Sequence, residues 1–174
     1  MVAAVILAAG ASTRFGSPKQ RLLLDPVLER VRAARSVDAI VVVLGAHAVE
    51  TEARTVQCPD WERGPGASLR CGLAALPADA DAAVVVLADG PALAPEAVDR
   101  VVGAWAGEPV LAASYGGVRG HPVLLARAVW DAVPDEGARA FEPLLVPCDD
   151  LGSPGDVDTA DELPEGLSRG EREQ

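Results

Sequence analysis

A glycine-rich stretch that carries isolated basic residues follows the first apolar run of the chain. The sequence VILAAGASTRFGSPKQ (5–20) contains Arg14 and Lys19, and Lys19 is the only lysine in a chain that otherwise uses arginine. Small residues let backbone N–H groups approach an anion closely, and a compact ammonium adds a point charge that suits phosphate oxygens. The stretch therefore predicts a phosphate-binding loop, although glycine content alone fits an ordinary strand-to-helix turn equally well.

The spacing within this stretch excludes two common phosphate-binding motifs. A P-loop needs GxxxxGK[ST], whereas Gly10 and Gly16 enclose five residues and Lys19 comes three residues after Gly16. The dinucleotide-binding fingerprint GxGxxG is also absent from the loop. A Walker-type NTPase and a standard dinucleotide-binding site are therefore not expected.

Regular elements around this stretch should place it at the edge of a sheet. Three aliphatic runs have the composition of strands buried on both faces: Val2–Leu7, Ala39–Leu44 and Ala82–Leu87. Helical patterns lie between and after them, over Pro26–Arg35, Ala46–Arg54, Gly66–Leu76 and Pro95–Ala106. This alternation predicts an α/β sandwich with a mostly parallel sheet. Ligands of such sheets bind beyond the carboxyl ends of the strands, which is where the glycine-rich stretch begins.

The second half of the chain has a different pattern. Pro109–Tyr115 and Val118–Leu125 are predicted to form a hairpin across Gly116–Gly117. A helix near Ala126–Ala132, a strand over Leu144–Cys148 and a short helix over Asp156–Leu163 are expected to follow. Since nothing resembles a linker, residues 1–163 should form a single domain, and the polar segment 164–174 a flexible tail.

Composition limits the possible partners and location. A net charge of −11 over 174 residues is unfavourable for a duplex nucleic-acid binder. The run Val2–Ala9 is too short to span a membrane. The three cysteines, Cys58, Cys71 and Cys148, lack metal-binding spacing, so we expect buried thiols in a protein of the reducing cytoplasm.

Five sequence blocks, in the same order along residues 2–163, resemble the MobA-like nucleotidyltransferases, and especially the molybdenum cofactor cytidylyltransferases. The first, LAAGASTRFGSPKQ, is similar to the signature LAAGxSxRxGxxK of that family. The other four are PDWERGPGASLRCGL (59–73), VVVLADGPAL (84–93), YGGVRGHPVLL (115–125) and GDVDTADEL (155–163). One such block would be weak evidence, but five in order are specific.

The resemblance implies a fold and a reaction. The fold is a three-layer α/β/α sandwich with the mostly parallel, Rossmann-like sheet of nucleotidyltransferases (the nucleotide-diphospho-sugar transferase type). In the reaction, an acceptor phosphate attacks the α-phosphate of a nucleoside triphosphate (NTP) and pyrophosphate leaves. Alanine as the third residue of LAAG resembles the cytidylyl branch, so the expected donor is CTP and the expected acceptor is molybdopterin or molybdenum cofactor. A molybdoenzyme would be a possible partner, and neither a nucleic acid nor a membrane is expected.

The family motifs also imply a role for each matching residue. Arg14 and Lys19 would hold the triphosphate and stabilise charge on the leaving pyrophosphate, which together with Asp89 makes them the expected catalytic residues. Asp89 and Asp158 would bind Mg²⁺, with Asp156 as the alternative second ligand. The expected nucleotide-binding residues are Leu7, Ala8, Ala9, Gly10, Ser68 and Gly72, and His121 would lie on the acceptor side. Trp61 is expected to pack beneath the nucleotide loop rather than to stack on the base.

Several departures from the family pattern keep alternatives open. After PKQRLLL the chain continues at once with Asp25–Pro26, where the family has a longer turn, and Gly90 replaces a larger residue in the Asp-x-Pro motif. The same chemistry could therefore act on another acceptor, such as a sugar phosphate or a phospholactate-type acid. A non-catalytic module that binds nucleotide or cofactor through a shortened loop is the other alternative.

Overall fold

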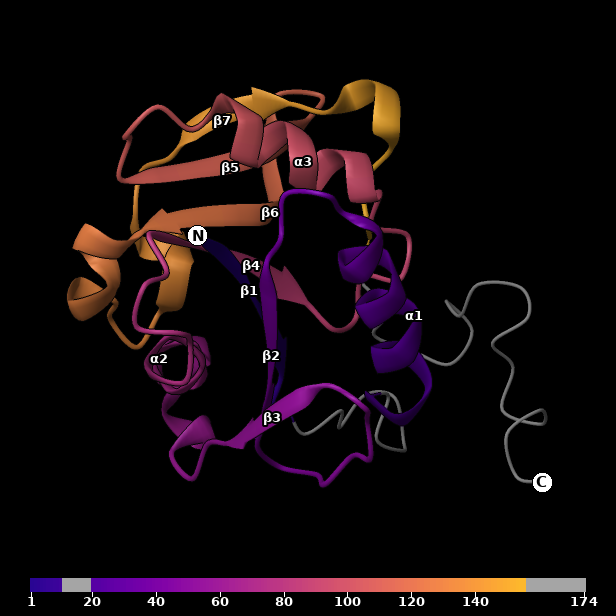
Figure 1. Cartoon of the computed structure of the whole chain (residues 1–174), viewed down its shortest axis with the longest axis vertical. Coiled ribbons are helices and arrows are strands. Elements are labelled where there is room, and N and C mark those ends of the chain that lie inside the picture. Colours follow the sequence, from indigo (N-terminus) through magenta and orange to yellow (C-terminus); the bar gives the residue numbers. More distant parts are fainter. Residues whose placement is uncertain (11–19, 156–174) are drawn as a thin grey trace.

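A seven-stranded, mostly parallel sheet forms the centre of the protein. The computed structural model describes residues 1–10 and 20–155. The strands are β1 (Val2–Ala8), β2 (Ala39–Leu44), β3 (Arg54–Gln57), β4 (Ala82–Leu87), β5 (Val110–Tyr115), β6 (Val118–Ala126) and β7 (Leu144–Pro147). They lie in the order β3-β2-β1-β4-β6-β5-β7 (Figure 1). Of these described strands, β6 alone runs antiparallel to its neighbours.

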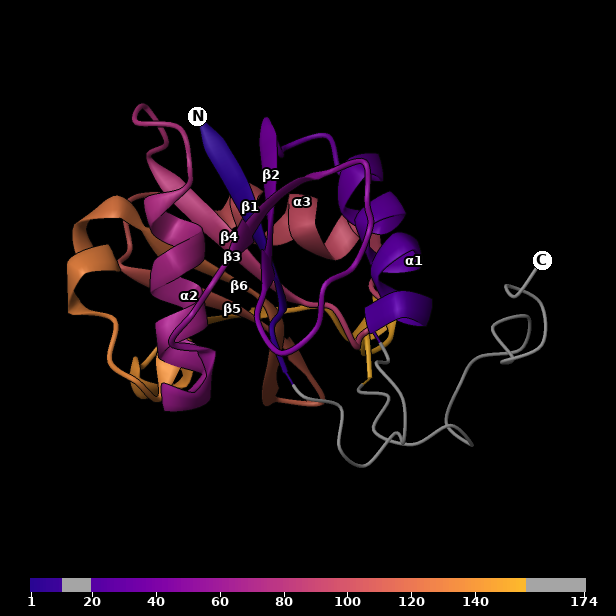
Figure 2. The same ribbon diagram turned by 90° about the horizontal axis from the view of Figure 1, so that it is seen from below.

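Helices cover both faces of this sheet. The helices α1 (Gln20–Ala33) and α3 (Pro95–Ala104) lie on one face, and α2 (Pro65–Ala74) lies on the other (Figures 1 and 2). Short 3₁₀ turns complete the described chain: η1 (Trp61–Arg63), η2 (Arg127–Ala132), η3 (Gly137–Ala140) and η4 (Asp149–Leu151). The predicted three-layer sandwich is confirmed. No helix in the described part of the chain has the length and apolar character needed to cross a membrane.

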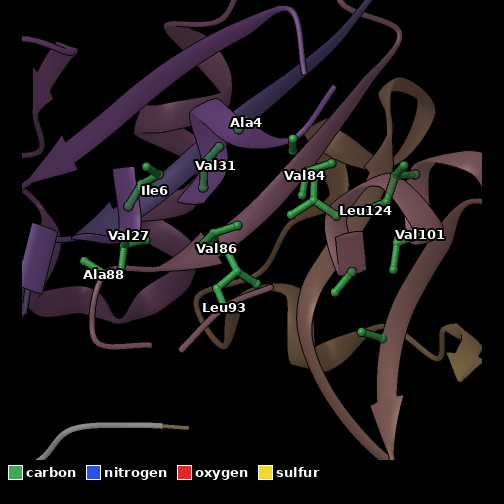
Figure 3. Packing of buried hydrophobic residues seen from close by; sticks show 14 of the residues in the cluster. Ala4, Ile6, Val27, Val31, Val84, Val86, Ala88, Leu93, Val101 and Leu124 are labelled. Atoms are coloured by element: carbon green, nitrogen blue, oxygen red, sulfur yellow. The ribbon is translucent and has the colours of Figure 1, made fainter. Parts of the chain in front are cut away.

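Alternating side chains of the central strands supply two separate cores. Ala4 and Ile6 of β1 point towards α1 and α3 and pack with Val27, Val31 and Leu124 (Figure 3). Their neighbours Ala3 and Val5 pack on the other face, in the cluster that includes Leu69 and Leu73 of α2. Burial on both faces explains why these strands are continuous aliphatic runs rather than alternating ones.

Most predicted strands are confirmed, and two predicted helices are wrong. The hairpin turns at Gly116 and Gly117, whose φ angles of 60° and 76° fit a tight two-residue turn that glycine allows. Residues 46–53 form no helix, and the segment leads instead into the edge strand β3, which pairs with β2. The helix expected near Ala126–Ala132 is a 3₁₀ turn over Arg127–Ala132. The helix predicted over Asp156–Leu163 and the tail predicted over 164–174 lie outside the described residues.

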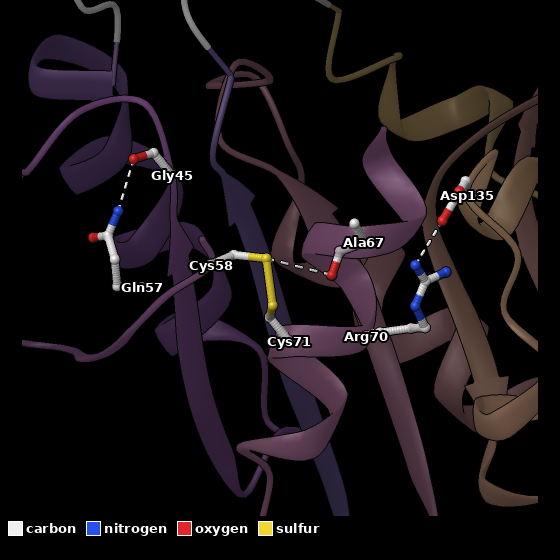
Figure 4. The surroundings of a disulfide bond; sticks show 7 residues. All are labelled: Gly45, Gln57, Cys58, Ala67, Arg70, Cys71 and Asp135. Atoms are coloured by element: carbon white, nitrogen blue, oxygen red, sulfur yellow. Dashed lines mark hydrogen bonds and ion pairs between the residues drawn. A yellow bond between two sulfur atoms is a disulfide. The ribbon is translucent and has the colours of Figure 1, made fainter. Parts of the chain in front are cut away.

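A disulfide links the end of β3 to α2. Cys58 and Cys71 are bonded, with 5.8 Å between their Cα atoms, and the Cys58 sulfur also lies 3.5 Å from the Ala67 carbonyl oxygen (Figure 4). The expectation of three separate thiols is therefore wrong for this pair, because the packing of α2 on the sheet brings together residues that are 13 positions apart. Cys148 is a buried free thiol as expected, and burial raises its pKa.

Reducing this disulfide should destabilise the protein measurably. A cross-link that closes a loop of about 15 residues is worth about 3 kcal/mol, which corresponds to a Tm lower by about 6–12 °C in a chain of this size. Thermal unfolding with and without a dithiol reductant measures the shift. The double variant Cys58→Ala/Cys71→Ala is the control, because its Tm should not respond to reductant. An unchanged wild-type Tm, with both thiols shown by alkylation to be reduced, would contradict this prediction.

Candidate active site

The ends of three adjacent strands form one edge at which the predicted site residues gather. Ala8 of β1 is in register with Leu44 of β2, and Leu7 is in register with Leu87 of β4. Because β6 is antiparallel to β4, its first residues enter the sheet at this same edge. The sheet thus brings the loop after β1, the turn after β4 and the start of β6 together, although they are far apart in sequence.

The backbone at the end of β1 is held by the chain on both sides. Ala88 donates a backbone hydrogen bond to the Leu7 carbonyl (3.0 Å), and Ala46 donates one to the Ala9 carbonyl (3.1 Å). A Cβ atom at Gly45 would lie 2.7 Å from the Ala9 oxygen and 2.7 Å from Trp61, so glycine permits this close approach. Trp61 therefore packs close to Ala9, and its role beneath a bound nucleotide stays a prediction. Ala8 and Ala9 are buried, Gly10 is exposed, and Arg14 and Lys19 lie outside the described residues.

Asp89 lies in the turn that follows β4. The side chain is half-buried and its Oδ1 atom is inaccessible to solvent. The described residues contain no group of three or more His, Cys, Asp or Glu side chains that could hold a metal without other ligands. One or two carboxylates completed by substrate phosphates and water is a common Mg²⁺ arrangement, so Asp89 fits the chemistry of such a site.

The turn after β4 also packs against the end of the described chain. A Cβ atom at Gly90 would lie 3.1 Å from the Gly155 carbonyl oxygen and 3.2 Å from Pro154 Cβ. A larger residue at position 90 would therefore require Pro154–Gly155 to shift by a few tenths of an ångström. Asp156 and Asp158 lie outside the described residues.

His121 lies at the start of β6, near Asp89, and is half-buried. Burial lowers its pKa to about 4, and the positive charge of Arg119 contributes in the same direction while Asp89 opposes it. The imidazole is therefore neutral at neutral pH, and it offers one donor and one acceptor rather than a positive charge. This agrees with a role in positioning a ligand at the predicted acceptor side.

Two adjoining cavities open at this edge and share Leu87, Arg119, Gly120 and His121. The first, about 310 Å³, lies between the turn after β4 and residues 153–155, and we call it the turn cavity. The second, about 350 Å³, lies on the α2 side of the sheet and is called the α2-side cavity. The turn cavity also includes Val86 and Leu93 from the α1 and α3 face of the sheet, whereas the α2-side cavity includes Leu69 and Val85 from the opposite face, so the two meet at the edge of the sheet.

The outer wall of the α2-side cavity is a segment tied to two other elements. This clamped segment, residues 133–141, receives hydrogen bonds from Arg70 of α2 to the Val133 carbonyl (2.9 Å) and to Asp135 (2.6 Å; Figure 4). Arg119 of β6 donates to the carbonyls of Phe141 (2.6 Å) and Ala138 (2.7 Å). The hydrogen bond from Arg70 also lowers the pKa of Asp135. Two guanidinium groups therefore fix the position of this wall.

The variant Arg119→Met should loosen the clamped segment while retaining most of the side-chain length. Losing two charge-assisted hydrogen bonds should reduce the free energy of unfolding by about 2 kcal/mol. Urea denaturation followed by circular dichroism measures this loss. Limited proteolysis should show new cleavage within residues 133–141 in the variant alone. The control Arg54→Met alters an exposed arginine of the edge strand β3, and an equal loss of stability in both variants would contradict the clamping role of Arg119.

Ser68 and Gly72 are buried on α2, and neither lines the two cavities. A Cβ atom at Gly72 would lie 2.5 Å from Val5 Cγ1 and 2.7 Å from Val43 Cγ2, so this glycine lets the helix pack closely on β1 and β2. Contact of either residue with a nucleotide stays a prediction. Arg70 and Arg119 were not among the predicted site residues, although both lie inside the quoted motif blocks and the glycine-rich context was a usable signal of close packing.

Comparison with known proteins identifies the type of domain. The family model described as "MobA-like NTP transferase domain" matches residues 4–141. A curated relative, the bifunctional protein GlmU of Mycolicibacterium gilvum, is 36% identical over an alignment of 106 residues, and the match covers 49% of this chain and 21% of that protein. The match thus spans about a fifth of the length of that relative.

Solved structures resemble the chain over almost its whole length. Rv0371c of Mycobacterium tuberculosis is 29% identical, with a TM-score of 0.76 over 92% of this chain and 95% of that one. A second structure of that protein, a complex with manganese, has a TM-score of 0.71 at 27% identity over 92% and 94% of the two chains. A nucleotidyl transferase of Methanothermobacter has the same fold, with a TM-score of 0.73 at 19% identity over 91% and 92%.

Proposed function

The chain belongs to the MobA-like NTP transferase domains and is therefore a nucleotidyltransferase, and from that premise we propose that it transfers CMP from CTP to a phosphorylated small-molecule acceptor. Pyrophosphate is the second product. The observation that carries the proposal is the half-buried Asp89 carboxylate directly after the carboxyl end of β4, where the next residue, Gly90, lines the turn cavity. Family membership leaves no reason to retain the non-catalytic binding module as a candidate.

We further propose that Asp89 and an aspartate of the GDVDT block share a divalent cation, with Mg²⁺ as the resident ion. Support comes from the contact of Gly90 with Gly155, because Gly155 directly precedes Asp156 in the chain. The manganese complex of the related Rv0371c is consistent with a divalent-cation site in proteins of this kind. Such a cation would neutralise charge on the triphosphate, and Asp158 is our preferred second ligand, with Asp156 as the alternative.

The chain's own residues supply the rest of the proposed site. The backbone of Leu7, Ala8, Ala9 and Gly10 would wrap the nucleotide, since the hydrogen bonds from Ala46 and Ala88 fix that backbone in place. Ser68 would border the nucleoside. Arg14 and Lys19 would hold the triphosphate and meet charge on the leaving pyrophosphate. The neutral His121 would orient the acceptor, whose phosphate is already ionised near neutral pH and needs no base.

Molybdopterin, or the molybdenum cofactor formed on it, is the proposed acceptor, and a molybdoenzyme is the proposed downstream partner. Both come from the resemblance of the five sequence blocks to the cytidylyl branch of the family. The cytoplasm stays the proposed location, but the Cys58–Cys71 disulfide removes the pattern of unpaired thiols on which that expectation rested. A sugar phosphate or a phospholactate-type acid is the alternative acceptor class, and a screen of acceptors with pyrophosphate as the readout separates these classes.

Isothermal titration of the protein with each of the four NTPs, in the presence of Mg²⁺, tests the donor. We expect CTP to bind at least about tenfold more tightly than ATP, GTP or UTP, a difference of about 1.4 kcal/mol. Tighter binding of another NTP would replace CTP as the donor and leave the transferase intact. Failure of all four to bind would overturn the proposed function.

The variant Lys19→Arg tests why the chain keeps a single lysine in this loop. We expect kcat to fall about tenfold, because the larger planar guanidinium cannot replace a compact ammonium between phosphate oxygens. Steady-state pyrophosphate release measures the change. Full activity in Lys19→Arg would mean that the charge matters and the choice of lysine does not, and Lys19→Gln then shows whether the charge itself is needed.

A further inference from the structure

Residues 120–122 form a bulge near the start of strand β6. On one side of it Val123 is in register with Ala112 of β5, and on the other side Arg119 is in register with Ser114. Three residues of β6 therefore lie opposite a single residue of β5. The pairing of β6 with β4 also stops at Val123, before the bulge. A bulge of this kind re-aims a side chain, and such bulges are common next to active sites.

The hydroxyl group of Tyr115, at the end of β5, holds this bulge from the neighbouring strand. It donates a hydrogen bond of 2.7 Å to the carbonyl oxygen of His121, the central residue of the bulge. The ring passes close to Gly120, since a Cβ atom there would lie 2.9 Å from two ring carbons. Partial burial raises the pKa of Tyr115 to about 12, so the hydroxyl keeps its proton well above neutral pH.

The backbone on both sides of Tyr115 is fixed by the chain that follows β7. Cys148 donates a backbone hydrogen bond of 2.8 Å to the Ser114 carbonyl. The Gly116 N–H donates to the carboxylate of Asp149. The Tyr115 side chain also packs against the core on the α1 and α3 face of the sheet. Because the backbone and the side chain are both held, the hydroxyl acts on the bulge from a fixed position.

Tyr115 is not itself part of the cavity surface. The described lining of the two cavities includes Gly120 and His121 but not Tyr115. A side chain that does not reach a cavity influences a ligand there only through the residues that do. Since small displacements of a positioning group weaken the productive geometry, the support of the His121 backbone can affect the reaction without contact between Tyr115 and the substrate.

We propose that Tyr115 is a positioning residue, whose hydroxyl holds the bulge of residues 120–122 and so directs the His121 imidazole at the turn cavity. The proposal rests on the proposed function, in which His121 is the group that orients the acceptor. Without the hydroxyl the bulge loses one anchor, so the imidazole is held less firmly and meets the acceptor less often. Binding of CTP, which the loop after β1 is proposed to supply, does not depend on this anchor.

The variant Tyr115→Phe removes the hydroxyl and keeps the aromatic ring. Modification by diethyl pyrocarbonate, mapped by mass spectrometry, measures how accessible the His121 imidazole is in the full chain. We expect its modification rate to rise about fivefold at a Tm within a few degrees of wild type, with His47 as the internal reference. The matched control is Trp105→Phe, which removes another aromatic donor to a backbone carbonyl, that of Glu108 (3.1 Å), and should leave the rate at His121 unchanged.

Steady-state pyrophosphate release from CTP, with Mg²⁺ and molybdopterin, measures whether the held imidazole serves the acceptor. In Tyr115→Phe we expect the KM for molybdopterin to rise about fivefold and the KM for CTP to stay unchanged. The same substitution in a His121→Ala background should change the KM for molybdopterin by less than about twofold, because a residue that acts through the imidazole has no effect once the imidazole is absent. Trp105→Phe should keep both KM values.

The possible outcomes separate this inference from the function on which it rests. An unchanged modification rate at His121 in Tyr115→Phe overturns the positioning role, and so does an unchanged KM for molybdopterin. Independent, additive effects of Tyr115→Phe and His121→Ala overturn the route through the imidazole. A wild-type chain that releases no pyrophosphate contradicts the proposed function instead, and the modification rates then still decide whether Tyr115 holds His121 in place.

Discussion

Replacing Asp89 with Asn should lower kcat/KM for pyrophosphate release by about 10³-fold while leaving the fold intact. The substitution keeps the size and shape of the side chain and removes its negative charge, which the proposed cation needs. A loss of several kcal/mol of transition-state stabilisation is usual when a cation that polarises a phosphoryl oxygen is lost, and about 4 kcal/mol corresponds to the stated factor. Asp89 lies in a turn after β4 rather than inside the strand, so its replacement should leave the sheet undisturbed.

The control for this variant is Asp131→Asn, which alters an exposed carboxylate on the η2 turn. It should retain wild-type kcat/KM. Both variants should keep the wild-type Tm to within a few degrees, which shows that any loss of activity does not come from unfolding. Chelation with EDTA should abolish wild-type turnover, and added Mg²⁺ should restore it. An Asp89→Asn protein with more than about a tenth of wild-type activity would contradict the proposed role of the carboxylate.

Replacing Gly66 with Ala should destabilise the protein about as much as losing the Cys58–Cys71 disulfide. A Cβ atom at this position would lie 1.6 Å from the Pro134 carbonyl oxygen and 2.7 Å from the Pro134 carbonyl carbon. Both are backbone atoms of the clamped segment, which cannot move aside by rotating a side chain. The hydrogen bond from Gly66 N–H to the Asp135 carbonyl (2.9 Å) would also be disturbed. We expect unfolding to become easier by about 3 kcal/mol, which lowers the Tm by about 6–12 °C.

Gly103→Ala is the matched control, because nothing lies within 4 Å of a Cβ atom at that position of α3. Alanine there should stabilise the helix by up to about 1 kcal/mol. Differential scanning calorimetry measures the Tm of both variants, and so compares the loss of a glycine that packing requires with the loss of one that it does not. A Gly66→Ala protein that melts at the wild-type temperature would contradict the docking of the clamped segment on α2.

The sequence contained enough information to predict the central strands and one edge of the site. β1, β2 and β4 are continuous aliphatic runs because both faces are buried, and such runs are visible without a structure. Since ligands bind beyond the carboxyl ends of such strands, the position of Asp89 directly after β4 was predictable as well. The hairpin between β5 and β6 followed from two consecutive glycines.

Other features depend on tertiary contacts that no local pattern encodes. β3 is only four residues long and mostly exposed, and it becomes a strand because the edge of β2 is open to pairing. The disulfide needs α2 packed on the sheet before Cys71 can reach Cys58. The clamped segment is held by Arg70, and the bonded pair Arg70 and Val133 are 63 residues apart in the chain. Its role as a cavity wall was therefore not predictable from spacing.

The measurement that tests the central claim most directly is pyrophosphate release by the full chain from CTP, with Mg²⁺ and molybdopterin-type acceptor supplied together. We predict release that requires both the nucleotide and the acceptor, equals the amount of CMP transferred, and disappears in Asp89→Asn. No pyrophosphate from CTP, ATP, GTP or UTP with this acceptor, or with a sugar phosphate or phospholactate-type acid in its place, would contradict the account.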